Sequence, residues 1–511
     1  MCADNKSDHS TDDDSEISHE AMSHQYTPLG YKLYRNKTVS RKRILAQTLV
    51  TGATMLTSAG CGMPVGYSAI LLPQLQNNND SMNINDELAS WIASVHSAAT
   101  PFGSLVSGML MDRCGRKLVL QFASVPLILG WILIGFAQNH TFLLLGRAVA
   151  GLSAGLSAAA GQVLIGEITE PHLRGMLSSG PFVSYSFGIL LVYALGSILP
   201  WRYVAGLSTI LPFTAILVFL FLPESPVWLV RHNKIEKAGE ALTWLRGGNH
   251  LQAKEETDHL VQRLQQETET KTSLKALLKP QVLKPLLIIN LFNILQILSG
   301  TYLIVFYAVD ILSHLNGESF DHFLAASLTA CVRFLFTIIS TLLLGVVGRR
   351  TLSLTSGIGT SLSALCLGVV LHQSCKENNL LMALFVLFYV ASNTIGFFVL
   401  PGVMLGELFP AKVRGHAGGF TFMIFNFVLF GVAKIFPFVK STIGISGVFW
   451  TFGASSLLAS LFLYLMLPET KGKSLSYIED YFQQNNLIWI RRDKNWENKF
   501  FNRNETERLN V

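Results

Sequence analysis

The chain has 511 residues, of which 50% are hydrophobic and only 14% are charged, against about 25% charged in an ordinary soluble protein. Its formal charge of +6 does not indicate a nucleic-acid-binding protein, because the basic residues lie in short segments between long apolar stretches. Composition therefore excludes a soluble multidomain enzyme and favours an integral membrane protein.

Residues 1–44 are polar, acidic near their start and without the apolar core of a secretory signal, so they are expected to form a disordered cytoplasmic tail. Twelve apolar windows follow, each about 20 residues long, the length that crosses a bilayer core about 30 Å thick. The windows are 46–70, 91–111, 118–137, 142–166, 178–199, 203–222, 286–309, 324–347, 352–372, 380–404, 416–438 and 446–467. The predicted fold is an all-α membrane protein with twelve transmembrane helices.

One long segment, 231–283, divides the windows six and six. Ile235, Ala238 and Leu242 recur there at helical spacing, which predicts a cytoplasmic linker of short amphipathic helices. It would join an N-terminal six-helix bundle, 45–230, to a C-terminal one, 284–470. The remaining residues, 471–511, are expected to form a cytoplasmic tail.

Basic residues mark one side of the predicted membrane. They occur before the first window and after the second, eighth and tenth, whereas 71–90, 138–141 and 310–323 contain no Lys or Arg. The positive-inside rule then places both termini in the cytoplasm, as expected for a multi-pass protein of the plasma membrane. The sequons at Asn79 and Asn139 fall outside and are predicted glycosylation sites.

Short motifs recur at matching places in the two halves. The loop Gly108–Lys117 after the second window has a counterpart in Gly345–Arg350 after the eighth. PESPVWL at Pro223–Leu229 ends the sixth window, and PETKGKSL at Pro468–Leu475 ends the twelfth. Such repetition suggests an internal duplication with a site between the halves.

From about residue 45 to 483, the order and spacing of these motifs resemble the sugar porter family of the major facilitator superfamily, most closely its facilitated trehalose transporter-like branch. The resemblance implies two six-helix bundles that expose a central site to each side of the membrane in turn, without a cofactor or a metal. It also implies a cytoplasmic gate of ion pairs that forms in the outward-facing state. The candidate gate residues are Asp112, Arg113, Arg116, Glu167, Arg174, Glu224, Arg349, Arg350, Glu407, Arg414 and Glu469. Gly345 stands where the pattern has an acid, so the second copy is expected to be weaker.

The resemblance also gives candidates for the substrate site. They are Gln296, Ser299, Tyr302, Tyr307, Arg333, Asn393, Thr394 and Phe182. Several depart from the family pattern, in which Phe182 would be Gln, Tyr302 would be Asn, and Gly402 would be Trp. Loss of hydrogen-bonding groups leaves hexose specificity unsupported, and a disaccharide or an amphiphilic solute fits equally well.

Arg333 replaces a family Asn in the middle of the eighth window. A charge there costs at least ~2.5–3.5 kcal/mol on insertion scales, so the side chain is expected to face a cavity or a partner. Two alternatives stay open for it: a place on the substrate path, or a structural contact with backbone carbonyl groups.

The first window contains no Asp or Glu, so Arg147 lacks the acid with which proton-coupled members of the family pair this arginine. Facilitated transport of a sugar, trehalose or a hexose, by a monomer is therefore the favoured function. A proton-coupled symporter that uses another acid, or a transporter-like sensor or inactive relative, stays open as an alternative. Neither catalytic residues nor a nucleotide-binding loop is present in the spans, so an enzyme is not expected.

Overall fold

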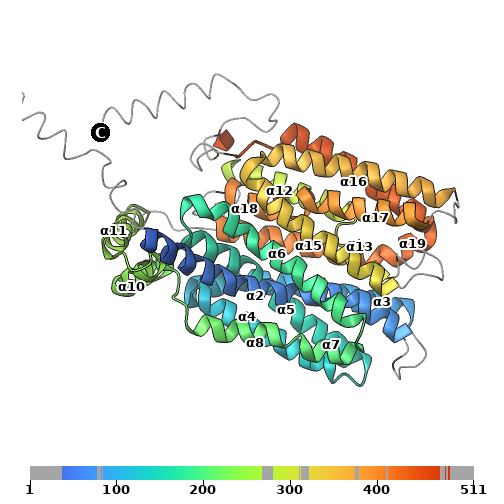
Figure 1. Cartoon of the computed structure of the whole chain (residues 1–511), viewed down its shortest axis with the longest axis horizontal. Helices are drawn as coiled ribbons and strands as arrows, with labels where there is room; N and C mark the ends of the chain where they lie inside the picture. The colour runs from blue at the N-terminus through green and yellow to red at the C-terminus, as the bar shows by residue number, and fades with distance from the viewer. Residues whose placement is uncertain are drawn as a thin grey trace, which may run out of the picture.

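The computed structural model describes residues 37–76, 82, 84–267, 280–309, 311, 322–373, 379–409, 413–471, 478 and 481–483. Within these residues every regular element is a helix. Figure 1 shows the helices of the first half, blue to green, on one side of the molecule and those of the second half, yellow to red, on the other. Both sets run along the long axis, which gives two packed bundles.

The first half contains α2 (Lys37–Gln76), α3 (Asp86–Cys114), α4 (Arg116–Gly135), α5 (His140–Ile168), α6 (Pro171–Gly196), α7 (Trp201–Leu207) and α8 (Ile210–Leu220). Asn85 caps α3 by accepting a hydrogen bond from the backbone N–H of Leu88 at 2.9 Å. Asn139 caps α5 in the same way, with the N–H of Phe142 at 3.0 Å. Each cap satisfies one of the N–H groups that a helix start leaves without a partner. The helix α2 already begins at Lys37, within the expected tail 1–44.

The short helix α9 (Pro226–Arg231) ends where the expected linker begins, and the linker itself forms α10 (Ile235–Leu245) and α11 (His250–Glu267). Ala238 and Leu242 are buried, as the helical spacing predicts, whereas Ile235 is exposed. Arg246 at the end of α10 donates to the backbone carbonyl of Ile168 on α5 at 3.3 Å. The described part of the linker is therefore attached to the first half.

The second half contains α12 (Pro280–Leu298), α13 (Leu303–Phe306), α15 (His322–Val346), α16 (Arg349–His372), α17 (Asn379–Asn393), the π-helix η3 (Thr394–Phe398), α18 (Leu400–Leu408) and α19 (Arg414–Met466). Gly444 interrupts α19 with φ +70° and ψ 171°, a conformation that favours glycine. This break separates the last two expected spans.

The described residues contain nine helices long and apolar enough to cross a membrane. To these are added α3, the shorter apolar helix Val282–Leu298, and the division of α19 at Gly444. The helices are therefore consistent with the twelve spans that the sequence predicts. Asn79 and most of the two expected tails lie outside the described residues.

Candidate functional site

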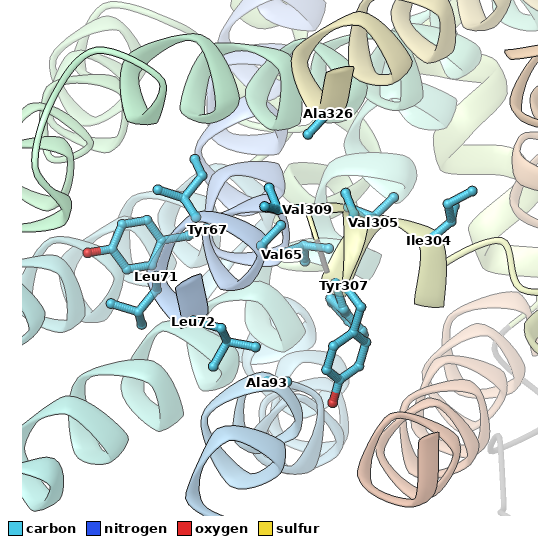
Figure 2. Close-up of a cluster of buried hydrophobic side chains, with 14 of the residues drawn as sticks. Val65, Tyr67, Leu71, Leu72, Ala93, Ile304, Val305, Tyr307, Val309 and Ala326 are labelled. Atoms are coloured by element: carbon cyan, nitrogen blue, oxygen red, sulfur yellow. The ribbon is translucent and has the colours of Figure 1, made fainter. Parts of the chain in front are cut away.

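The two halves pack against each other at one end of the bundle, which we call the closed end. Figure 2 shows buried side chains of α2, among them Tyr67 and Leu72, in one cluster with Ile304 and Val305 of α13. The hydroxyl of Tyr193 on α6 donates to the backbone carbonyl of Val305 at 2.6 Å. Because these groups come from both halves, the closed end forms a continuous apolar seal.

A lysine also joins the halves at this end. Lys434 of α19 donates to the hydroxyl of Ser90 on α3 at 2.7 Å. Its ammonium lies 4.1 Å from the ring centroid of Trp91, a favourable cation–π distance. Both contacts lie near the start of α3, so they strengthen the seal.

Charged residues gather at the opposite end, which we call the charged end. Arg116 at the start of α4 is buried and donates from Nη2 to Oε1 of Glu167 on α5 at 2.9 Å. Its Nη1 donates to the backbone carbonyl of Met111 at 3.0 Å and lies 3.7 Å from the carboxylate of Asp112. Ser225 donates its hydroxyl to the other oxygen of Glu167. Such additional hydrogen bonds offset part of the cost of burying an ion pair.

The second half repeats the main bonds of this cluster. Arg349 at the start of α16 donates from Nη2 to Oε1 of Glu407 at 2.8 Å. Its Nη1 donates to the backbone carbonyl of Leu344 at 3.0 Å, five residues back, the same separation as in the first half. Thr470 donates its hydroxyl to the other oxygen of Glu407 at 2.5 Å. The structure thus shows the internal duplication that the motifs suggest.

Glu224 and Glu469 bind backbone N–H groups, where the motifs predict guanidinium partners. Glu224 accepts from the N–H of Arg116 at 3.0 Å, and Glu469 accepts from that of Arg349 at 3.0 Å. Each carboxylate also accepts from the next N–H along its helix. The first N–H groups of a helix lack internal partners and lie at the positive end of its dipole, which explains why they attract the acids.

Glycine precedes both of these helices for a steric reason. A Cβ atom at Gly115 would overlap the carboxylate of Glu224, and one at Gly348 would overlap that of Glu469. Gly115 also has a φ of +102°, where other residues are strained. The repeated Gly-Arg pair is therefore what lets a carboxylate reach each helix start.

The remaining gate candidates make weaker contacts. Arg174 donates to a backbone carbonyl at the end of α5 at 3.4 Å. The guanidinium of Arg350 packs over the ring of Tyr464, 4.9 Å from its centroid, and donates to the carbonyl of that residue. Arg113 makes no ion pair with a described residue, and the side chain of Arg414 lies outside the described part of the chain.

No ion pair between described residues at the charged end crosses from one half to the other. The second cluster lacks an acid at Gly345, where the first has the exposed Asp112. This difference removes one long contact, and the second ion pair is as short as the first. The ion pairs described here therefore fasten helices within a bundle.

The helix that opens the second half is broken near the centre of the molecule. Gly300, with φ +83°, separates α12 from α13. The hydroxyls of Ser299 and Thr301 both donate to the backbone carbonyl of Gln296, at 2.7 and 3.0 Å. Tyr389 on α17 donates to the carbonyl of Ser299. Broken helices of this kind line substrate sites in transporters, because their free backbone and polar side chains face a cavity.

Three buried polar atoms around this break have no hydrogen-bond partner among the described residues. They are Oε1 of Gln296, Oδ1 of Asn393 and Nη1 of Arg333. The amide nitrogen of Asn393 donates to the hydroxyl of Ser299 at 3.4 Å, which places it at the break. An unsatisfied buried polar group costs about 1–3 kcal/mol. These atoms therefore indicate a site for a polar ligand or for water.

Arg333 makes the contact with a backbone carbonyl group that was one of the two alternatives for it. Its Nη2 donates to the backbone carbonyl of Thr301 at 2.9 Å, and its guanidinium carbon lies 5.2 Å from the ring centroid of Phe398. It also lines a cavity of about 10 Å³ between the halves, together with Tyr193 and Val305. A space of this size holds about one water molecule.

Aromatic rings from both halves surround the centre. Phe182 on α6 lies against Gly402 on α18, where a Cβ atom would overlap the ring. The ring centroid of Phe398 is 6.2 Å from that of Phe182, 6.2 Å from that of Tyr185 and 6.1 Å from that of Tyr302. Such faces can pack against the apolar side of a sugar ring.

Two predicted site residues use their hydroxyls elsewhere. Tyr307 donates to the backbone carbonyl of Ala433 on α19 at 3.0 Å and belongs to the closed-end cluster (Figure 2). Thr394 donates to the carbonyl of Val390 at 2.6 Å. Both residues therefore support the packing around the centre.

Arg147 on α5 is fully buried in the first half. Its Nη1 donates to the backbone carbonyl of Pro64 at 3.1 Å, and its Nη2 donates to the hydroxyl of Ser68 at 2.5 Å. Among the described residues its hydrogen-bond partners on α2 are thus a carbonyl and a hydroxyl. This agrees with the acid-free first span.

The sequence model of a family described as "Sugar (and other) transporter" matches residues 59–482. The chain belongs to this family. The facilitated trehalose transporter Tret1 of Culex quinquefasciatus is 32% identical over 449 residues, which cover 86% of this chain and 86% of that protein. The Tret1 of Bombyx mori is 31% identical over 87% of this chain and 88% of its own length. This chain spans only 56% of the Anopheles gambiae Tret1, to which it is 32% identical.

Solved structures show the same fold at lower sequence identity. The proton:xylose symporter XylE bound to 6-bromo-6-deoxy-D-glucose has a TM-score of 0.73 and 20% identity, covering 86% of this chain and 100% of that chain. An inward-open conformation of the xylose transporter XylE from E. coli has a TM-score of 0.69. The chain therefore has the major facilitator fold, and its family is one of transporters, not of enzymes.

Two residues that depart from the sugar transporter pattern, Gly402 and Phe182, are in contact in the structure. Gly402 lacks the large ring of the family, and the ring of Phe182 from the other half takes up the space beside it. Sequence reasoning missed Tyr185, Tyr389 and Ser68. Tyr185 could have been found, because it lies three residues after Phe182 and so shares its face of α6.

Proposed function

We propose that this protein carries a sugar across the plasma membrane by facilitated diffusion. The observation that carries the proposal is a set of polar atoms of Gln296, Arg333 and Asn393 that lack a hydrogen-bond partner within the described part of the chain and are buried at the helix break. Two relatives named as facilitated trehalose transporters make trehalose the first solute to test, with hexoses second. In this proposal each half exposes the site to one side of the membrane in turn.

The contacts of Arg147 support a facilitator over a proton-coupled symporter. Its bonded partners are the hydroxyl of Ser68 and the carbonyl of Pro64, and neither group titrates in the physiological pH range. Coupling to protons needs a group whose charge changes during the cycle. Transport is therefore expected to follow the solute gradient alone.

The contacts between the halves support an inward-facing conformation, and we propose a monomer from the family resemblance alone. The seal lies at the closed end, and the basic charged end fits the cytoplasmic side together with both termini. Asn139 would then face outward, and its cap on α5 uses only Oδ1, which leaves the amide nitrogen for a glycan. Asn79 is proposed as a second glycosylation site on its sequon alone.

Counterflow in proteoliposomes tests the proposed function. Labelled trehalose or glucose is expected to exchange with an internal pool of the same sugar faster than in protein-free liposomes. Gln296→Ala is expected to lower the rate about tenfold, since a lost solute hydrogen bond of about 1.4 kcal/mol corresponds to that factor. Gln252→Ala in the linker is the matched control, because this glutamine bonds to Glu256 away from the centre. If no sugar in the panel exchanges, the sensor or inactive relative is favoured instead.

A further inference from the structure

A groove of about 730 Å³ lies at the charged end between α2 and the linker helix α10, apart from the central site. This volume falls within the roughly 300–1,000 Å³ of ligand sites. Leu45 and Leu49 of α2 form an apolar wall, Trp244 lies on the facing helix, and Lys42 and His250 also line the groove. We propose that this groove binds an anionic membrane phospholipid, with an acyl chain against the leucines and the phosphate near Lys42.

The apolar wall continues the lipid-facing surface of the first span. That span begins at Arg41, and Leu45 and Leu49 are 59% and 47% exposed. Leucines exposed on a membrane-spanning helix contact acyl chains, because no water is present beside them. A chain that packs on this surface can therefore enter the groove without leaving the bilayer.

The facing wall has the composition of a membrane interface. Trp244 is 39% exposed, and tryptophan is enriched at the headgroup level because its ring is apolar with one polar edge. Ile235 at the start of the same helix is also exposed. Ile235 lies nine residues before Trp244, on the opposite side of the helix, so Trp244 alone is proposed to contact the bilayer surface.

Lys42 gives the groove a cation for the phosphate of an anionic lipid. Lys42 makes no ion pair with a described residue, whereas its neighbour Arg43 lies 3.4 Å from Glu170. The groove also holds one acid, Glu240, on the α10 side. A lysine can extend its apolar stem along the leucines and present its ammonium to a phosphate. Each basic residue near an anionic surface raises affinity about fivefold.

A bound lipid would bridge the first span and the linker. The linker is already held beside the groove by Arg246, which lies 2.7 Å from Glu256 and 3.5 Å from Glu170. Because Glu170 precedes α6 and Glu256 lies in the linker itself, the lipid would add an attachment of the linker to α2. Its occupancy would therefore set how firmly the linker rests on the first half.

Tryptophan quenching by brominated lipids tests the proposal. The purified full chain in detergent is titrated with phosphatidylglycerol or phosphatidylcholine whose acyl chains carry bromine, and the signal of Trp244 is the difference between wild type and Trp244→Phe. Phosphatidylglycerol is expected to quench Trp244 at least fivefold more tightly than phosphatidylcholine. Lys42→Gln is expected to weaken that binding about fivefold. Lys237→Gln is the matched control, because it removes a cation from α10 outside the groove.

Three results would overturn the assignment. Equal quenching by both lipids would mean that the groove does not select an anion. Equal effects of Lys42→Gln and Lys237→Gln would remove Lys42 from the site. Absence of quenching by either lipid would mean that another segment of the chain fills the groove or that it is closed to the bilayer. Melting temperatures of the variants with and without lipid show whether each one is folded.

Discussion

The Gly402→Ala variant tests whether transport requires the two halves to approach closely at the centre of the molecule. A Cβ atom at this position would lie 2.9 Å from Cε1 and 3.1 Å from Cε2 of Phe182, and nearer still to Cζ. Non-bonded carbon atoms ordinarily stay about 3.5–4.0 Å apart. Because Phe182 belongs to α6 in the first half and Gly402 to α18 in the second, either the ring turns away or the halves separate.

The magnitude follows from the cost of overpacking, about 1–3 kcal/mol. That cost falls only on conformations in which α6 and α18 are close, so it disfavours them by about 5- to 150-fold relative to the others. A transporter that must pass through such a conformation slows accordingly. Phe182→Ala removes the obstructing ring, so Phe182→Ala combined with Gly402→Ala is expected to be faster than Gly402→Ala alone.

Sugar exchange in proteoliposomes measures the effect for the two single variants, the double variant and wild type. Gly406→Ala is the matched control, because this glycine lies on the same helix with open space around it. An exchange rate of Gly402→Ala equal to that of Gly406→Ala would refute the reasoning. So would a double variant as slow as Gly402→Ala, since the ring would then not be the obstacle.

Two further predictions concern the ion pairs of the charged end and the driving force of transport. Arg349→Gln is expected to lower the free energy of unfolding by about 2–3 kcal/mol. The loss is smaller than for a fully buried pair, because the side chains of Arg349 and Glu407 are 12% and 24% exposed. Adding Glu407→Gln is expected to cost little more, and additive losses in thermal unfolding would argue against a direct pair. Uptake is expected to vary less than about twofold between about pH 5.5 and 7.5, because the hydroxyl of Ser68 does not titrate there; sugar accumulation driven by a proton gradient would contradict this.

The helices were predictable because apolar windows of membrane length have few alternative structures. Their ends were less so: α2 extends from Lys37 to Gln76, well beyond the window 46–70, because a helix can continue past the apolar region once it is formed. The break at Gly444 lies in the gap between the windows 416–438 and 446–467. The composition of the sequence thus correctly located the break between the last two spans.

The site was predictable only in part, for a physical reason. A motif position indicated that Gln296 would be central, and the charge of Arg333 within a span indicated a cavity or a partner; both residues are buried beside the helix break. A motif does not say whether an acid meets a side chain or a helix start, so the backbone partners of Glu224 were missed. Contacts between distant segments, such as Phe182 with Gly402, depend on how the halves pack and leave no signal in either segment.

The duplicated charged clusters have a mechanical consequence. Each one fastens several helix ends of one bundle, as Arg116 on α4 joins Glu167 on α5 and, through it, Ser225 at the start of α9. A bundle that does not bend transmits a small displacement at the centre of the molecule to its ends. Since the described ion pairs lie within one bundle, a rocking motion between the bundles need not break them, and the resistance to that motion comes from the surfaces that slide past each other. The bonds that make each bundle rigid therefore do not oppose movement of one bundle against the other.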